Sequence, residues 1–220
     1  MTKLLPASIM AVALAAGVAV SPDSDRAERS ALPGPSPKWV EPTGTVLFSD
    51  RFTSTKLDGW KADRDSVWKV IRGMLRGDLP DGKQERAFLY AGSDDWTDYV
   101  VDLDVCAMRG VDKGFGVRVS PGQTGIAVDL RGPGYQDVLL QRREWPMGKV
   151  RVNNANGAWH HLRLEARGQR YRVWVNGDLL IDRTDPHATR SKGGIALAAY
   201  TGGIGVCTIY FDNVVVVGLN

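Results

Sequence analysis

Alternating apolar and polar positions run through most of the chain from residue 45 onward and predict β-strands rather than helices. The clearest stretch, Trp159 to Asp182, contains two alternating runs, 161–166 and 171–175, and a shorter third run, 179–182. The turns between them hold Arg167-Gly168-Gln169-Arg170 and Asn176-Gly177-Asp178, which place glycine or asparagine where a hairpin needs positive φ. This stretch therefore predicts consecutive antiparallel hairpins with one polar face and one face toward a core.

The remaining strand candidates are short and are separated by turns rich in glycine and proline. No window shows a convincing 3.6-residue apolar period, which argues against amphipathic helices. The expected strands are 46–49, 67–72, 87–91, 99–108, 115–120, 126–131, 137–143, 195–200 and 206–217. This pattern predicts an all-β fold, a two-sheet antiparallel β-sandwich.

The amino-acid composition limits the class of protein but does not indicate a function. Hydrophobic residues make up 43% of the 220 and charged residues 24%, which suits a folded domain with a sizeable core. The formal net charge is +3, and the basic residues are dispersed rather than gathered in a stripe. Nucleic acid is therefore not an expected partner.

The N-terminal region predicts export followed by a linker. Residues 1–19 combine Lys3, an apolar run from Ile9 to Val18 and small residues at the expected cleavage positions, as in a signal peptide. The apolar run is too short for a retained membrane anchor, which needs about 20 residues. Residues 20–44 hold five of the eleven prolines and predict an extended, solvated linker. We therefore expect a secreted or extracellular protein, with no membrane contact after cleavage and a domain over residues 45–220.

Six motifs carry a family resemblance that covers nearly all of this domain. They are LFSDRF (47–52), LDGW (57–60), VWKVIRGMLRG (67–77), the Trp159 hairpin with VNG (175–177), GGIAL (193–197) and IYFDNVVV (209–216). In this order they resemble the concanavalin A-like lectin/glucanase jelly rolls, closest to secreted bacterial 3-keto-disaccharide hydrolase-like and laminin-G-like domains. The resemblance implies a jelly roll and a ligand site on a concave sheet face, but the fold hosts many activities.

The alternation within four strands predicts which residues would line such a face. If 100–106, 115–120, 126–131 and 137–145 share one sheet, their polar positions gather on one side. For a carbohydrate ligand we expect Arg118, Asp129, Arg131, Gln141, Arg143 and Trp145, with Asp102 and Asp104 on the same face. Trp145 lies in the loop-bound REWPMG, where it could stack on a sugar ring or simply pack the loop. A solvated outer face with cross-strand ion pairs is the alternative.

Catalytic chemistry is not clearly encoded. Retaining glycosidases hold two carboxyls about 5–5.5 Å apart, and no two glutamates here share a strand. The candidate acids or bases are Asp102, Asp104, Asp129 and Glu144. A nucleophile elbow is absent, and the three histidines lack zinc-ligand spacing. Whether the protein is an enzyme, and then one with glycoside hydrolase-like activity, stays open.

The resemblance also implies a structural calcium ion. Similar jelly rolls hold Ca²⁺ between an aspartate after the first strand and one on the last strand. The corresponding residues here are Asp50 and Asp212, with backbone carbonyls as further oxygen ligands. The alternative is that both aspartates only cap turns.

Cys106 and Cys207 are the only cysteines, and an even count in an exported chain favours a disulfide. Their strands meet if they are antiparallel neighbours, as the resemblance suggests. However, Cys207 shares parity with the inward Ile209, whereas Cys106 shares parity with Asp102. A disulfide therefore needs a bulge near Arg109-Gly110, and otherwise both are free thiols.

Three functions follow from these observations. The expected one is a secreted carbohydrate-binding module that acts on extracellular glycans. The alternatives are a glycan-active hydrolase of the 3-keto-disaccharide kind and a structural adhesion domain.

Overall fold

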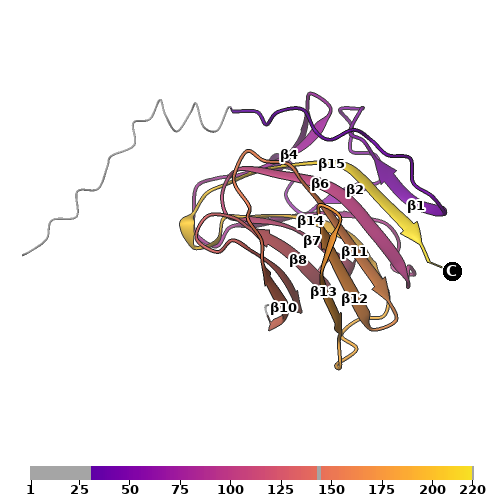
Figure 1. The fold of residues 1–220 in the computed structure, drawn as a ribbon. Coiled ribbons are helices and arrows are strands. Elements are labelled where there is room, and N and C mark those ends of the chain that lie inside the picture. Colours follow the sequence, from indigo (N-terminus) through magenta and orange to yellow (C-terminus); the bar gives the residue numbers. More distant parts are fainter. Residues whose placement is uncertain (1–30, 143–144, 220) are drawn as a thin grey trace, which may run out of the picture.

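The structure is a computed structural model that describes residues 31–142 and 145–219, and its fifteen strands form two antiparallel sheets (Figure 1). We call them the back sheet and the front sheet. The back sheet has the order β13 (Asp178–Thr184), β12 (Arg170–Val175), β11 (His160–Arg167), β6 (Tyr99–Arg109), β15 (Cys207–Gly218), β4 (Met74–Leu79) and β3 (Trp68–Ile71), and β1 (Thr45–Asp50) also pairs with β15. The front sheet has the order β10 (Trp145–Arg151), β9 (Asp137–Arg142), β8 (Ile126–Arg131), β7 (Asp112–Val119), β14 (Gly194–Tyr200), β5 (Arg86–Ala91) and β2 (Trp60–Ala62). Two 3₁₀ turns, η1 (Asp65–Val67) and η2 (Gly202–Ile204), complete the described elements.

The predicted all-β sandwich is thus confirmed, and so are the hairpins after Trp159. Leu162 pairs with Val175 and Arg167 with Arg170, and β12 then pairs with β13. Asn176 and Gly177 both have positive φ, 52° and 93°, which a two-residue turn between right-twisted strands requires.

The main core lies between the two sheets and follows the alternation of each strand. Phe115, Val128 and Leu197 project into it from the front sheet, and Leu103 and Leu164 from the back sheet, each at most 1% exposed. Because each strand has its apolar positions on this side, its alternate positions face outward, and those of the front sheet form the surface described below.

One strand lies in a different sheet from the one we predicted. Residues 99–109 form β6 in the centre of the back sheet, between β11 and β15, and not beside β7 and β8. Asp102 and Asp104 therefore lie on the outer face of the back sheet, far from the front-sheet surface. Alternation predicts the face on which a side chain lies, but it contains no information on which sheet a strand joins.

Residues 31–44, which we call the strap, lie along the outer face of the back sheet (Figure 1). The Asn213 amide donates to the Pro37 carbonyl over 2.9 Å, and the Trp159 indole N–H donates to the Gly34 carbonyl over 2.9 Å. Leu32 packs on a small apolar cluster that includes Cys106 and Tyr210. This part of the proline-rich segment is therefore attached to the domain and not simply an extended linker.

The predicted disulfide is wrong, because Cys106 and Cys207 are both buried free thiols. Cys207 belongs to the core between the sheets, whereas Cys106 belongs to the cluster beneath the strap. Cys106 pairs with Tyr210, and Cys207 pairs with Leu79 on the other side of β15. The two sulfur atoms thus lie on opposite faces of one sheet, as their parity indicated.

In the described part of the chain, no helix is long and apolar enough to cross a membrane. The predicted signal peptide, residues 1–19, lies outside the described residues.

Candidate functional site

A groove of about 970 Å³ runs across the outer face of the front sheet. Its floor is made of small residues on the three central strands, where Gly116 pairs with both Ala127 and Ala196, and Ala198 follows on β14. Small side chains at neighbouring positions leave a flat, open floor between the larger residues at either side. A groove of this size suits a small or medium-sized ligand.

Asp129 is the central acidic group of the groove. It pairs with Gly114, where a Cβ atom would lie 2.0 Å from Asp129 Oδ1, so the carboxylate lies over the glycine backbone. Its other oxygen accepts a hydrogen bond from the Gln141 amide. Burial and the nearby Asp112 carboxylate raise the pKa of Asp129 to about 7. Asp129 is therefore a carboxyl group that can both release and accept a proton near neutral pH.

Asp112 lies diagonally from Asp129 on the neighbouring strand and lines the same groove. Burial also raises the pKa of Asp112. Two carboxyl groups close together disfavour double ionisation, so the pair tends to keep one proton.

Two pairs of arginine and tyrosine flank this acidic pair. The Arg131 guanidinium lies 4.3 Å from the ring centre of Tyr135 and forms two hydrogen bonds, 2.7 and 2.8 Å, with Asp137. On the other side, Arg86 lies 4.6 Å from the ring centre of Tyr200. Tyr135 is 56% exposed, so it offers a ring to a ligand. Aromatic faces beside carboxylate, amide and guanidinium groups are chemically suited to a sugar ring and its hydroxyls.

The structure thus brings together three of the predicted ligand residues, Asp129, Arg131 and Gln141. The functional groups of the groove that were missed include Asp112, Arg86, Tyr135 and Tyr200. Asp112 could have been predicted from the sequence. The strand begins at Asp112 rather than at Phe115, and its alternation places Asp112, Gly114 and Gly116 on one face.

Arg118 does not reach the groove, contrary to our prediction. It has a positive φ of 54° at a point where the pairing between β7 and β14 shifts register, and its side chain is 1% exposed. The guanidinium donates to Asp98 over 3.0 Å, to the Thr97 carbonyl over 3.0 Å and to the Tyr171 hydroxyl over 2.8 Å. Arg118 therefore links loops at one end of the sandwich, since the irregular backbone turns it away from the face that strict alternation assigns.

Trp145 is 70% exposed on the edge strand β10 and is not among the residues that line the groove. It pairs with Arg142, and a strand begins at Trp145, within the segment that we had interpreted as a loop. Arg143 and Glu144, the remaining predicted ligand and catalytic candidates, lie outside the described residues.

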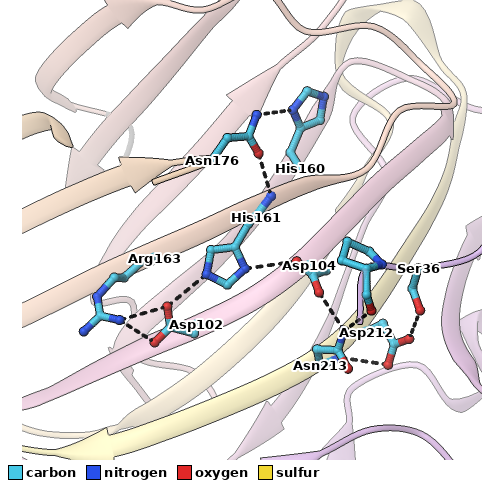
Figure 2. Close-up of polar contacts among 10 residues, drawn as sticks. Ser36, Asp102, Asp104, His160, His161, Arg163, Asn176, Asp212 and Asn213 are labelled. Atoms are coloured by element: carbon cyan, nitrogen blue, oxygen red, sulfur yellow. Dashed lines mark hydrogen bonds and ion pairs between the residues drawn. The ribbon is translucent and has the colours of Figure 1, made fainter. Parts of the chain in front are cut away.

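Asp102 and Asp104 flank one imidazole on the outer face of the back sheet (Figure 2). His161 Nδ1 lies 3.0 Å from Asp104 and Nε2 lies 3.1 Å from Asp102. Hydrogen bonds to Asp102 and Asp104 raise the pKa of His161 to about 9. Arg163 also binds Asp102. The two cationic side chains are partly exposed and Asp104 is buried, so these residues form a charge network on the back sheet that is not part of the groove.

The predicted calcium ligands each bind groups of the protein itself. Asp50 accepts hydrogen bonds from the Phe52 N–H over 2.7 Å and the Trp60 indole over 2.8 Å. Asp212 accepts from the Ser36 hydroxyl and from the Asn213 N–H (Figure 2). Across residues 31–142 and 145–219, no three His, Cys, Asp or Glu side chains group as a metal site. Calcium binding at Asp50 and Asp212 stays a prediction.

The two antiparallel sheets form a jelly roll with the concanavalin A-like glucanase/lectin fold. Residues 45–217 match the family model described as a 3-keto-alpha-glucoside-1,2-lyase-like domain. The chain belongs to that family. A comparison with curated proteins found no match.

Solved structures share the fold at low sequence identity. The carbohydrate-binding module CBM66 from Bacillus subtilis has a TM-score of 0.58 and 18% identity, over 73% of this chain and 96% of that one. The Ca²⁺/Man3GlcNAc-bound exoplasmic/lumenal domain of VIP36 has a TM-score of 0.62 and 11% identity, over 80% and 91%. The β-glucanase of Bacillus licheniformis has a TM-score of 0.58 and 13% identity, over 81% and 100%. These likenesses establish the fold.

Proposed function

We propose that the protein is a carbohydrate-binding domain that works outside the cell and binds a sugar unit of a glycan in the front-sheet groove. One observation carries the proposal. The exposed ring of Tyr135 contacts Arg131 and lines the same open groove as the hydrogen-bonded pair Asp129 and Gln141. A sugar could place its apolar ring face on Tyr135 and its hydroxyls against the polar groups. The family and the carbohydrate-binding neighbours support this ligand class.

Calorimetric titration with a panel of glucosides and their 3-keto derivatives tests the proposal. Tyr135→Ala should weaken binding about 2–13-fold, since an aromatic contact contributes about 0.5–1.5 kcal/mol beyond area burial. Trp145→Ala is the matched control, because it removes an exposed aromatic residue outside the groove and should leave affinity unchanged. If the wild type binds no member of the panel, or if only Trp145→Ala weakens binding, the groove is not the site.

Export is a separate part of the proposal and rests on residues 1–19. Expression of the full chain in a bacterial host should release a protein whose N-terminus lies near residue 20. Retention of residue 1 in the mature protein would contradict it.

A second candidate function is lyase chemistry at the same groove, favoured by the pKa of Asp129 near 7. In a 3-keto-α-glucoside the ketone at C3 acidifies the hydrogen on C2. The Asp129 carboxylate would take this proton, a C1=C2 double bond would form, and the glycosidic C1–O bond would break with its electron pair leaving on oxygen. The alkoxide would then take up the proton held by Asp129, which restores the carboxylate. The products are a 1,2-unsaturated 3-keto sugar and the released alcohol.

Product detection separates the two candidates. Incubation of the wild type with a 3-keto-α-glucoside should give the ultraviolet absorbance of the conjugated ketone if the lyase function holds, and Asp129→Asn should abolish it. Because asparagine keeps the shape of the side chain, this variant should still bind the sugar. If the wild type binds the sugar but forms no product, the carbohydrate-binding function is supported and the lyase function is refuted.

A further inference from the structure

Lys113 is completely buried between the two sheets, with no exposed surface. It lies on β7 with the same parity as Phe115 and Val117, so its side chain points away from the groove and toward the interior. Its ammonium group donates a hydrogen bond to Asn154 Oδ1 in the segment between β10 and β11. Burial lowers the pKa of Lys113 to about 8, so the group is still mostly cationic at pH 7.

No carboxylate neutralises this charge within the part of the chain that the structure describes. The titratable groups that interact electrostatically with Lys113 are the Cys106 thiol and the His160 imidazole, and neither supplies a negative charge at pH 7. Burial raises the pKa of Cys106 to about 11, so the thiol is neutral at pH 7. A buried cation without a counter-charge costs several kcal/mol, and proteins normally pair or neutralise it.

Two further buried residues near Lys113 carry nitrogen atoms without an acceptor: Asn154, which binds its ammonium group, and His160, whose imidazole interacts with its charge. Asn154 is 1% exposed and His160 is 6% exposed, and neither Asn154 Nδ2 nor His160 Nε2 has a hydrogen-bond partner among the described residues. His160 Nδ1 lies 3.5 Å from the Asn176 amide nitrogen, so Nδ1 accepts and Nε2 carries the hydrogen (Figure 2). Burial, and then the charge of Lys113, lower the pKa of His160 to about 4, which keeps the ring neutral. The cluster therefore presents one positive charge and two spare N–H donors.

We propose that Lys113, Asn154 and His160 bind a small monovalent anion of halide size between the two sheets. Such an anion accepts hydrogen bonds from all three groups and cancels the buried charge. A water molecule could accept the same hydrogen bonds, but it carries no charge and would leave the lysine uncompensated. The chemistry of the cluster, which contains donors and a cation but no anion, favours the anion.

The position of the cluster links it to the groove. Lys113 directly follows Asp112, whose side chain lines the groove on the opposite face of β7. An anion that holds Lys113 and Asn154 together would fix β7 against the segment that contains Asn154. The inference does not depend on the ligand of the groove.

Crystals of the wild-type protein soaked in sodium bromide test the site directly. We expect an anomalous bromine peak within hydrogen-bond distance of Lys113 Nζ, Asn154 Nδ2 and His160 Nε2. Electron density for a water molecule between these atoms, without anomalous signal, would overturn the proposal. Direct contact among the three side chains, with no density between them, would overturn it as well.

Thermal melting at pH 7 tests binding in solution. Replacing gluconate by chloride at constant ionic strength should raise the melting temperature of the wild type, by about 5–10 °C when chloride reaches about 100 times its Kd. Lys113→Met should lose this chloride dependence, and Lys149→Met, at an exposed position, should keep it. Equal melting temperatures of the wild type in both salts would refute the anion site. If Lys113→Met does not fold, Asn154→Leu provides the same comparison, with a chloride response weakened at least threefold expected.

Discussion

Replacing Arg118 by methionine tests whether this arginine holds the fold or binds the ligand. Its guanidinium is 1% exposed, and it donates to Asp98, to the carbonyls of Thr97 and Gly168, and to the Tyr171 hydroxyl. Methionine keeps much of the volume but removes the cation beside Asp98 and the donor to the Thr97 and Gly168 carbonyls and the Tyr171 hydroxyl, while Asp98 keeps its hydrogen bond from the Gly168 N–H. Asp98 is 34% exposed, so the cost comes mainly from the lost hydrogen bonds of the buried guanidinium, together about 3–5 kcal/mol at about 1.5–3 kcal/mol for a hydrogen bond to a charged group.

For a domain of this size, 1 kcal/mol corresponds to about 2–4 °C in melting temperature. We therefore expect Arg118→Met to melt about 6–20 °C below the wild type in a calorimetric scan. Arg151→Met, at an exposed position on β10, is the control and should melt within about 2 °C of the wild type. Glycan affinity of the folded Arg118 variant, measured well below its melting temperature, should equal that of the wild type. An unchanged melting temperature together with a loss of glycan affinity would refute the structural role and indicate that Arg118 binds the ligand.

Three further predictions concern protonation and metal. Because the pKa of Asp129 is raised to about 7, sugar binding that uses its carboxylate should strengthen between pH 6 and 8, and Asp129→Asn should flatten this profile in titrations. The pKa of His161 is raised from 6.5 to about 9 by Asp102 and Asp104. Its stabilising contribution is complete below pH 6.5 and is lost as the pH rises toward 9. The melting temperature of the wild type should therefore fall more than that of His161→Gln between pH 6.5 and pH 9. Solvent limits the difference to about 1 kcal/mol, since the imidazole is 43% exposed. If calcium is bound, chelation should lower the melting temperature of the wild type but not of Asp212→Ala, and identical curves with and without chelator in the wild type would speak against an ion.

The sequence contained enough information for the fold and for half of the predicted ligand set. Alternation with turn residues predicted the hairpins of β11 to β13, and it also placed Asp129, Arg131 and Gln141 on one face. These three residues lie on regular, adjacent strands whose pairing has no register shift. Their common face therefore follows from parity alone.

The other site predictions depended on information that alternation does not contain. Arg118 lies at a register shift, and one irregular residue is enough to turn a side chain to another environment. Asp102 and Asp104 have the predicted outward orientation but belong to the other sheet, because strand order is set by long-range pairing. Tyr135 and Tyr200 come from strand ends and turns, where no periodic pattern identifies a neighbour across the groove.

The attachment of the strap has a consequence for how the protein can be presented to a ligand. Gly34 and Pro37 are bound to the outer face of the back sheet, and the groove opens on the front sheet. A carrier protein, bead or surface joined to the chain ahead of residue 31 would therefore be attached behind the sandwich. Immobilised in that way, the domain would present its groove toward the solution, where long glycan chains could approach without meeting the support.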